Sequence, residues 1–109
     1  MTSIADVRAI ALSLAGATEA PHFHYASFRI RGKIFVTVPP EETHIHVFLP
    51  DQEREMALTL YPQFVEKLLW GGKVVGVRVT LGYAQPDVGQ QLIRQAWIAK
   101  APKKLTAQT

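Results

Sequence analysis

The chain has 109 residues, of which 48% are hydrophobic and 19% are charged, so it is long enough and apolar enough to bury the core of one globular domain. It contains no cysteine, which excludes disulfides and thiolate metal sites, and its net charge of +3 permits anionic partners without requiring them. No apolar run approaches the roughly 20 residues that cross a bilayer, and no signal peptide is visible. We therefore expect a single cytoplasmic domain over residues 1–109, with no membrane partner.

The first predicted element is a helix over about Ile4 to Leu14. Ser3 is a suitable N-cap, and Asp6 three residues later completes a capping-box pattern. Gly16 is typical of a helix end. From there to His24 we expect a loop.

Three strands are predicted next, over about Ser27 to Arg31, Lys33 to Val38 and His44 to Leu49. The first two form a hairpin because polar and apolar residues alternate on both sides of a glycine. A turn of two residues places Phe35 on the face of Phe28 and Ile30, with Ile34 and Val36 on the arginine face. A turn of three places Phe35 on the face of Arg29 and Lys33. The sequence permits both registers.

The second half of the chain is predicted to contain four elements. They are a helix over about 51–60, a short helix over about 63–70, a strand over about 75–81 and a long helix over about 87–100. Trp70 and Trp97 are assigned to the core, and the polar tail over about 101–109 is expected to fray. This order predicts an α+β fold: a single compact domain with a twisted, mainly antiparallel sheet and N-terminal and C-terminal helices packed on it.

Candidate catalytic and metal sites are weak. His44 and His46 project from the same side of a predicted strand, as a two-histidine metal site requires, but the spacing fixes no third ligand. We favour the interpretation that both face solvent. The chain has no nucleophilic cysteine and no Gly-x-Ser-x-Gly elbow, and Gly71-Gly72-Lys73 precedes a strand rather than a helix. We therefore predict no enzymatic activity and no cofactor.

The best remaining candidate is a cationic surface on the predicted sheet. Its residues lie on the strands or near their ends: Arg29, Arg31, Lys33, Lys73 and Arg78. Such side chains can bind phosphates, and an exposed Phe35 or Tyr25 could stack on bases. The alternative is that these are the ordinary solvent-facing residues of a half-buried sheet. Part of the positive charge also lies near the end of the chain, in Lys100, Lys103 and Lys104.

Four segments carry a family resemblance. They are Leu14–Glu19, Phe28–Phe35, Val77–Val79 and Ala96–Leu105, and the most specific parts are the Gly-Lys-Ile-Phe hairpin and the Ala-Trp with Ala-Pro-Lys ending. Together they resemble the MmcQ/YjbR-like family of small bacterial proteins over most of the chain. Two positions depart from the family pattern. Ala15 stands where proline is usual, and Gly76 stands where tryptophan is usual, a space that Trp70 could fill.

The resemblance implies a frataxin/CyaY-like α+β architecture and a proposed DNA-binding role, sometimes described as a double-wing motif. It transfers no enzymatic activity, and it brings no iron site because the first helix lacks an acidic ridge. Two functional hypotheses follow. The first is a module that binds DNA or another polyanion through the cationic sheet face and the hairpin tips. The alternative is a small module, which could be dimeric, that binds a protein or an anionic ligand and has no nucleic-acid role.

Overall fold

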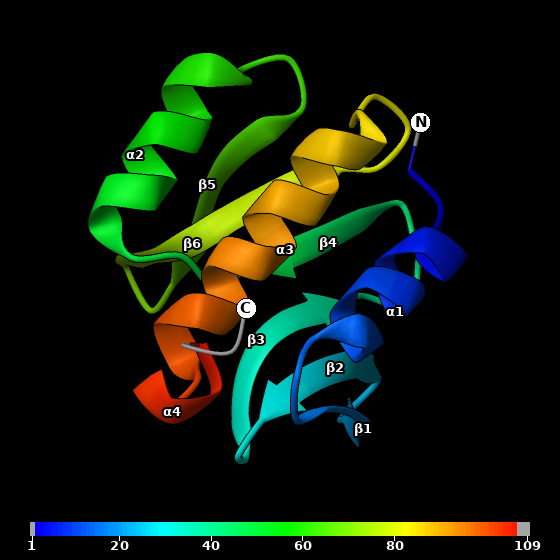
Figure 1. The fold of residues 1–109 in the computed structure, drawn as a ribbon. Helices are drawn as coiled ribbons and strands as arrows, with labels where there is room; N and C mark the ends of the chain where they lie inside the picture. The colour runs from blue at the N-terminus through cyan, green and yellow to red at the C-terminus, as the bar shows by residue number, and fades with distance from the viewer. Residues whose placement is uncertain (1, 107–109) are drawn as a thin grey trace.

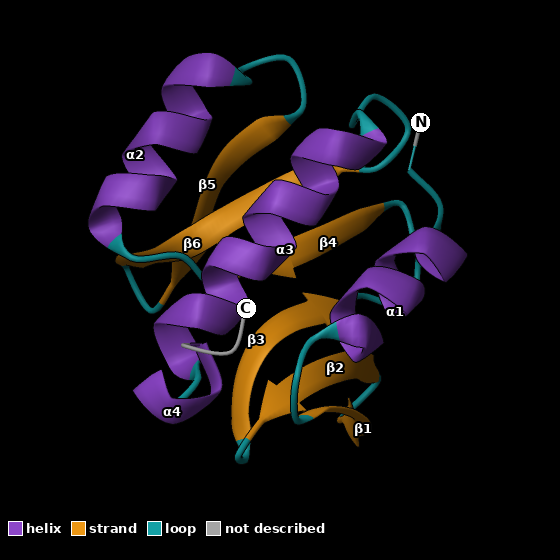
Figure 2. Ribbon diagram, viewed as in Figure 1, coloured by secondary structure: helices purple, strands orange, loops and turns teal. Residues whose placement is uncertain are grey.

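The computed structural model describes residues 2–106 as a layer of helices on a six-stranded sheet (Figures 1 and 2). The helices are α1 (Ile4–Ser13), α2 (Asp51–Leu60), α3 (Pro86–Lys100) and α4 (Lys103–Thr106). The strands are β1 (Ala17–His22), β2 (Tyr25–Ile30), β3 (Lys33–Val38), β4 (His44–Val47), β5 (Val65–Trp70) and β6 (Lys73–Thr80). The predicted α+β class is confirmed.

The sheet has the strand order β1-β2-β3-β4-β6-β5, and every neighbouring pair is antiparallel. In Figure 2, α1, α2 and α3 lie over one face of the sheet, and no helix of residues 2–106 covers the other, which we call the open face. Side chains alternate between the two faces along each strand, so the helix side takes the core and the open face takes the remaining side chains.

Both edge strands differ from the sequence prediction. β1 was expected to be a loop because it contains Pro21, but an edge strand tolerates proline, and β1 pairs only with β2. The segment of β5 was expected to be a short helix with Phe64, Leu68 and Val65 facing inward. In the strand Val65 and Leu68 are both buried but lie on opposite faces: Val65 pairs with core residue Val79, and Leu68 pairs with Gly76 on the open face.

The β2–β3 hairpin combines the two registers that the sequence left open. Next to the two-residue turn, Ile30 pairs with Lys33 and Arg29 with Ile34. Beyond a β-bulge, Phe28 pairs with Val36, the register expected for a three-residue turn. The extra residue is Phe35, which is fully buried in the core, so it cannot stack on a ligand at the surface.

Helix α3 is held to the rest of the domain by Trp97. Its side chain is fully buried, as predicted, and its indole Nε1 donates a hydrogen bond of 3.0 Å to the carbonyl of Ala15. Beyond α3 the expected frayed tail is ordered as α4, because Leu105 packs against the core. Residues 107–109 of the predicted tail lie outside the described part of the chain.

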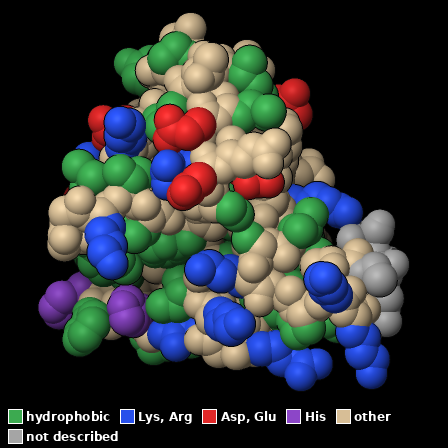
Figure 3. All heavy atoms as spheres, turned by 90° about the vertical axis from the view of Figure 1, so that its left-hand side faces the viewer, with side chains coloured by type: hydrophobic (Ala, Val, Ile, Leu, Met, Phe, Trp, Pro, Cys, Tyr) green, Lys and Arg blue, Asp and Glu red, His purple; other side chains and the backbone are tan. Residues whose placement is uncertain are grey.

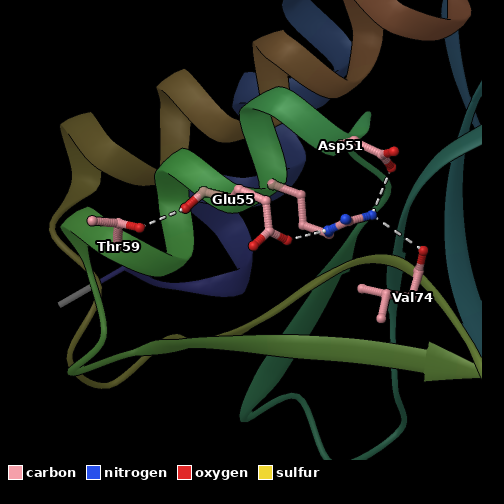
Figure 4. Close-up of polar contacts among 5 residues, drawn as sticks. Asp51, Glu55, Thr59 and Val74 are labelled. Atoms are coloured by element: carbon pink, nitrogen blue, oxygen red, sulfur yellow. Dashed lines mark hydrogen bonds and ion pairs between the residues drawn. The ribbon is translucent and has the colours of Figure 1, made fainter.

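One arginine joins α2 to the β5–β6 hairpin (Figure 4). The guanidinium of Arg54 donates to the carboxylates of Asp51 and Glu55, each at 2.8 Å, and to the backbone carbonyl of Val74 at 3.3 Å. These two carboxylates raise the pKa of Arg54, so the charge of the bridge persists at any physiological pH. The bridge fixes the start of β6, which carries Lys73.

Gly76 lets β4 and β6 approach unusually closely. A Cβ atom at this position would lie 2.1 Å from the carbonyl oxygen of Val47 and 2.9 Å from the Cα of Phe48. The space beside Gly76 is therefore filled by the backbone of the neighbouring segment. The family resemblance had suggested that the side chain of Trp70 could fill it.

We expect Gly76→Ala to destabilise the fold by about 1–3 kcal/mol or more, because the added methyl group meets rigid backbone. Gly82→Ala is the matched control, since a Cβ there meets nothing within 4 Å. Urea denaturation of both variants measures the difference. Equal free energies of unfolding for Gly76→Ala and the parent would contradict the close approach.

Candidate functional site: a cationic end and an open sheet face

The structure separates the five predicted cationic residues into two groups. Arg31, Lys33 and Lys73 are exposed in or beside the hairpin turns, where Arg31 has a positive φ of 52°. Arg29 and Arg78 instead project from the open face, on β2 and β6, with β3 and β4 between them. The five residues therefore do not form one continuous stripe along the sheet.

The two hairpin turns lie at the same end of the sheet. β3 and β6 are both antiparallel to β4, so they run in the same direction, and the turns at 31–32 and 71–72 come directly before them. In Figure 1, α4 lies between these two turns at the end of α3. This arrangement brings residues far apart in sequence to one end of the molecule.

Helices α3 and α4 add three lysines to this end. Contacts place them there: Leu105 of α4 comes close to Gly16 next to Ile30, and Lys100 lines a groove of about 220 Å³ with Val75 and Phe48. We define the cationic end as Arg31, Lys33, Lys73, Lys100, Lys103 and Lys104. From the sequence, the three lysines were counted as part of the positive charge but were not assigned to a site, because they fall at the boundary of a segment expected to fray.

Three acidic side chains lie far from the cationic end, whereas Asp51 and Glu55 lie beside it, paired with Arg54 next to Val74. Glu41 and Glu42 lie in the loop that follows β3, and Asp87 lies at the start of α3, which follows β6, so all three are at the opposite end of the sheet. Figure 3 shows the same separation on one face of the molecule, with Lys and Arg side chains gathered in its lower part and Asp and Glu in its upper part. The cationic end therefore keeps a local excess of positive charge, since Asp51 and Glu55 are paired with Arg54.

A row of polar side chains crosses the open face. Cross-strand pairing aligns one residue from each of five strands: Ser27, Thr37, His46, Arg78 and Glu66. The hydroxyl of Thr37 lies 3.3 Å from Nδ1 of His46, and Arg78 contacts a Glu66 oxygen and Nδ1 of His44, both at 3.3 Å.

Arg29 is held in place beside this row. Its Nε donates to Oγ of Ser27 at 3.0 Å, and its Nη2 donates to the carbonyl of Pro21 at 3.3 Å. Ser27 in turn donates to the carbonyl of Ala20 at 2.6 Å. These contacts join β2 to the edge strand β1, so Arg29 has a structural role whether or not it meets a ligand.

The two histidines of β4 differ from the prediction that both face solvent. His46 is buried, with 8% of its surface exposed, whereas His44 is half-buried. Burial, with smaller contributions from the charges of Arg78 and His44, lowers the pKa of His46 below its ordinary value of 6.5. Within residues 2–106 no group of three or more His, Asp or Glu side chains is arranged to hold a metal ion.

A groove of about 510 Å³ runs over the open face. The side chains that shape it come from β2, β4, β5 and β6: Tyr25, His46, Glu66, Leu68, Trp70 and Arg78. Trp70 is 44% exposed, so its assignment to the core is wrong. Its ring contacts Phe48 edge to face, with centroids 5.1 Å apart. No helix in the described part of the chain is long and apolar enough to cross a membrane.

Comparison with known proteins agrees with this architecture. The YjbR family model matches residues 12–99 of the chain. Among solved structures, the chain is similar to Deinococcus radiodurans protein DR2400, described as having a DUF419 domain, with a TM-score of 0.78 and 16% identity. The match covers 99% of this chain and 88% of that one, and it shows a shared fold. No curated protein matches the chain significantly.

The burial of His46 predicts a pH dependence of stability. Because its folded pKa lies below 6.5, the unfolded chain binds this proton more readily, so stability is complete above about pH 6.5 and falls as the pH drops toward the folded pKa. His46→Gln should flatten the change in unfolding free energy between about pH 7.5 and 5.5. His24→Gln, which removes an exposed imidazole, should retain it. An unchanged slope in His46→Gln would contradict this assignment.

Proposed function

The chain belongs to the YjbR family, and from that premise we propose that it is a non-enzymatic DNA-binding module. The observation that carries the proposal is the cationic end, where two hairpin turns, the end of α3 and the start of α4 present six positive side chains together. Hairpin turns and helix ends project from the domain, so they can reach the phosphates of a nucleic acid without rearrangement of the core.

The chemistry of these side chains suits a phosphate backbone. Lysine and arginine side chains bind phosphate oxygens and displace the counterions that surround DNA. Arg31, Lys33 and Lys73 have no acidic partner among the described residues, so their charges are free to do this. Arg78 differs, because Glu66 already neutralises part of its charge. The proposed phosphate contacts therefore lie at the end of the sheet rather than along its face.

Charge reversal at the hairpin turns tests the proposal. We expect Lys33→Glu and Lys73→Glu each to weaken binding to duplex DNA at least about threefold at low salt, and the double variant at least about tenfold, because each removes a phosphate contact. The double variant should also show a shallower dependence of affinity on salt. Fluorescence anisotropy of a labelled duplex over a series of salt concentrations measures both effects.

Arg94→Glu is the matched control. It makes the same change in net charge at an exposed position in the middle of α3, away from the hairpin turns, and should bind nearly as the parent does. Equal weakening by Arg94→Glu would mean that only net charge matters. Absence of DNA binding in the parent, together with a stoichiometric thermal shift from a small anion, would favour the ligand-binding alternative.

A further inference from the structure

Trp70 is an exposed aromatic side chain directly beside the cationic end. It is the cross-strand partner of Lys73, so a ligand that contacts the lysine at the hairpin turn is one residue from the indole ring. Phe48 packs against Trp70 and also lines the groove that contains Lys100. The aromatic surface and the phosphate-binding charges are therefore continuous.

The groove that begins at Trp70 offers hydrogen bonds as well as stacking. Thr37 engages Nδ1 of His46, which leaves Nε2 with no hydrogen-bond partner among the described residues. His46 lines the groove, and no fully buried side-chain nitrogen or oxygen in the described part lacks a partner, so this nitrogen is not completely enclosed. Tyr25 lies nearby, with its ring centroid 6.0 Å from that of His46. These polar groups can meet the edge of a planar heterocycle.

The distribution of charge along the groove favours one orientation of a bound strand. Its far side carries Glu41, and Glu66 beside it is paired with Arg78, whereas its near side borders Lys73, which has no acidic partner among the described residues. A nucleic acid strand that enters from the cationic end therefore keeps its backbone at the lysines while its bases extend over the sheet. In a duplex the bases are stacked on one another, so only an unpaired base can stack on a side chain in this way.

We propose that the open face binds unpaired bases of a single DNA strand, with Trp70 as the stacking platform, while the cationic end holds the phosphates. This proposal rests on the proposed DNA-binding function and deepens it by naming the form of nucleic acid that is preferred.

Tryptophan fluorescence tests the proposal directly. The only other tryptophan, Trp97, is fully buried, so stacking of a base quenches the emission of Trp70 alone. We titrate the full chain with a single-stranded oligonucleotide and with a duplex of the same length. We expect quenching with the single strand only, and an affinity for it at least about fivefold higher, as expected for one stacked base.

Two variants separate stacking from folding. Trp70→Leu should lose the preference for single strands while its anisotropy with duplex stays the same, and Trp70→Phe should keep most of the preference because a ring remains. If Trp70→Leu binds single strands as the parent does, stacking is wrong although DNA binding stands. If neither form of DNA binds, both proposals are wrong. Saturation by a mononucleotide at the oligonucleotide's concentration would instead make the groove a small-ligand pocket and overturn the proposal.

Discussion

The side chain of Trp97 fixes the position of α3 against the rest of the domain, and much of the molecule depends on that placement. Its ring is fully buried, and its indole nitrogen is bonded to the carbonyl of Ala15 in the segment between α1 and β1. A single residue thus joins the beginning of the chain to its end. Because α3 is held in this position, Lys100 and the helical turn after it lie beside the two hairpin turns, where their charges add to those of the hairpins.

The arrangement of the sheet likewise follows from a simple constraint. In the part of the chain that the structure describes, helices cover one face of the sheet, so the alternation of side chains along each strand separates a dry core from a polar open face. The bulge at Phe35 retains this separation near the turn by moving one extra aromatic ring into the core. On the open face, the polar side chains bond mainly to one another, so a buried imidazole such as that of His46 has a hydrogen-bond partner and remains compatible with a stable fold.

The proposed function uses both parts of this architecture. The charges proposed to bind phosphate are at the end of the sheet, where loops are exposed, and the groups proposed to meet bases are on the open face next to them. Arg54 links these parts mechanically, because it ties the start of β6 to α2 and so holds Lys73 and its partner Trp70 in a defined position. The chain belongs to the YjbR family, and a shared fold does not by itself specify a ligand.

Local chemistry was enough to predict much of the fold. The capping box of Ser3 and Asp6 starts α1 as expected, and Gly32 marks the β2–β3 turn, because both signals act between near neighbours. Phe35, Trp70 and the edge strands required the tertiary structure. Phe35 is buried because of a bulge, Trp70 is placed by its contact with Phe48 beyond β4, and each edge strand is fixed by pairing with its neighbour in the sheet.

For the candidate site, too, the sequence predicted one part and the tertiary structure was needed for the other. From the sequence alone, the cationic residues of the hairpins could be identified, since alternation and a glycine turn place them near strand ends. Only the tertiary structure could bring Lys100, Lys103 and Lys104 to the same end, because strand order and the packing of α3 determine that proximity. A sequence determines the charge that each residue carries, whereas the electrostatic potential depends on the distances between those charges, and the fold sets those distances.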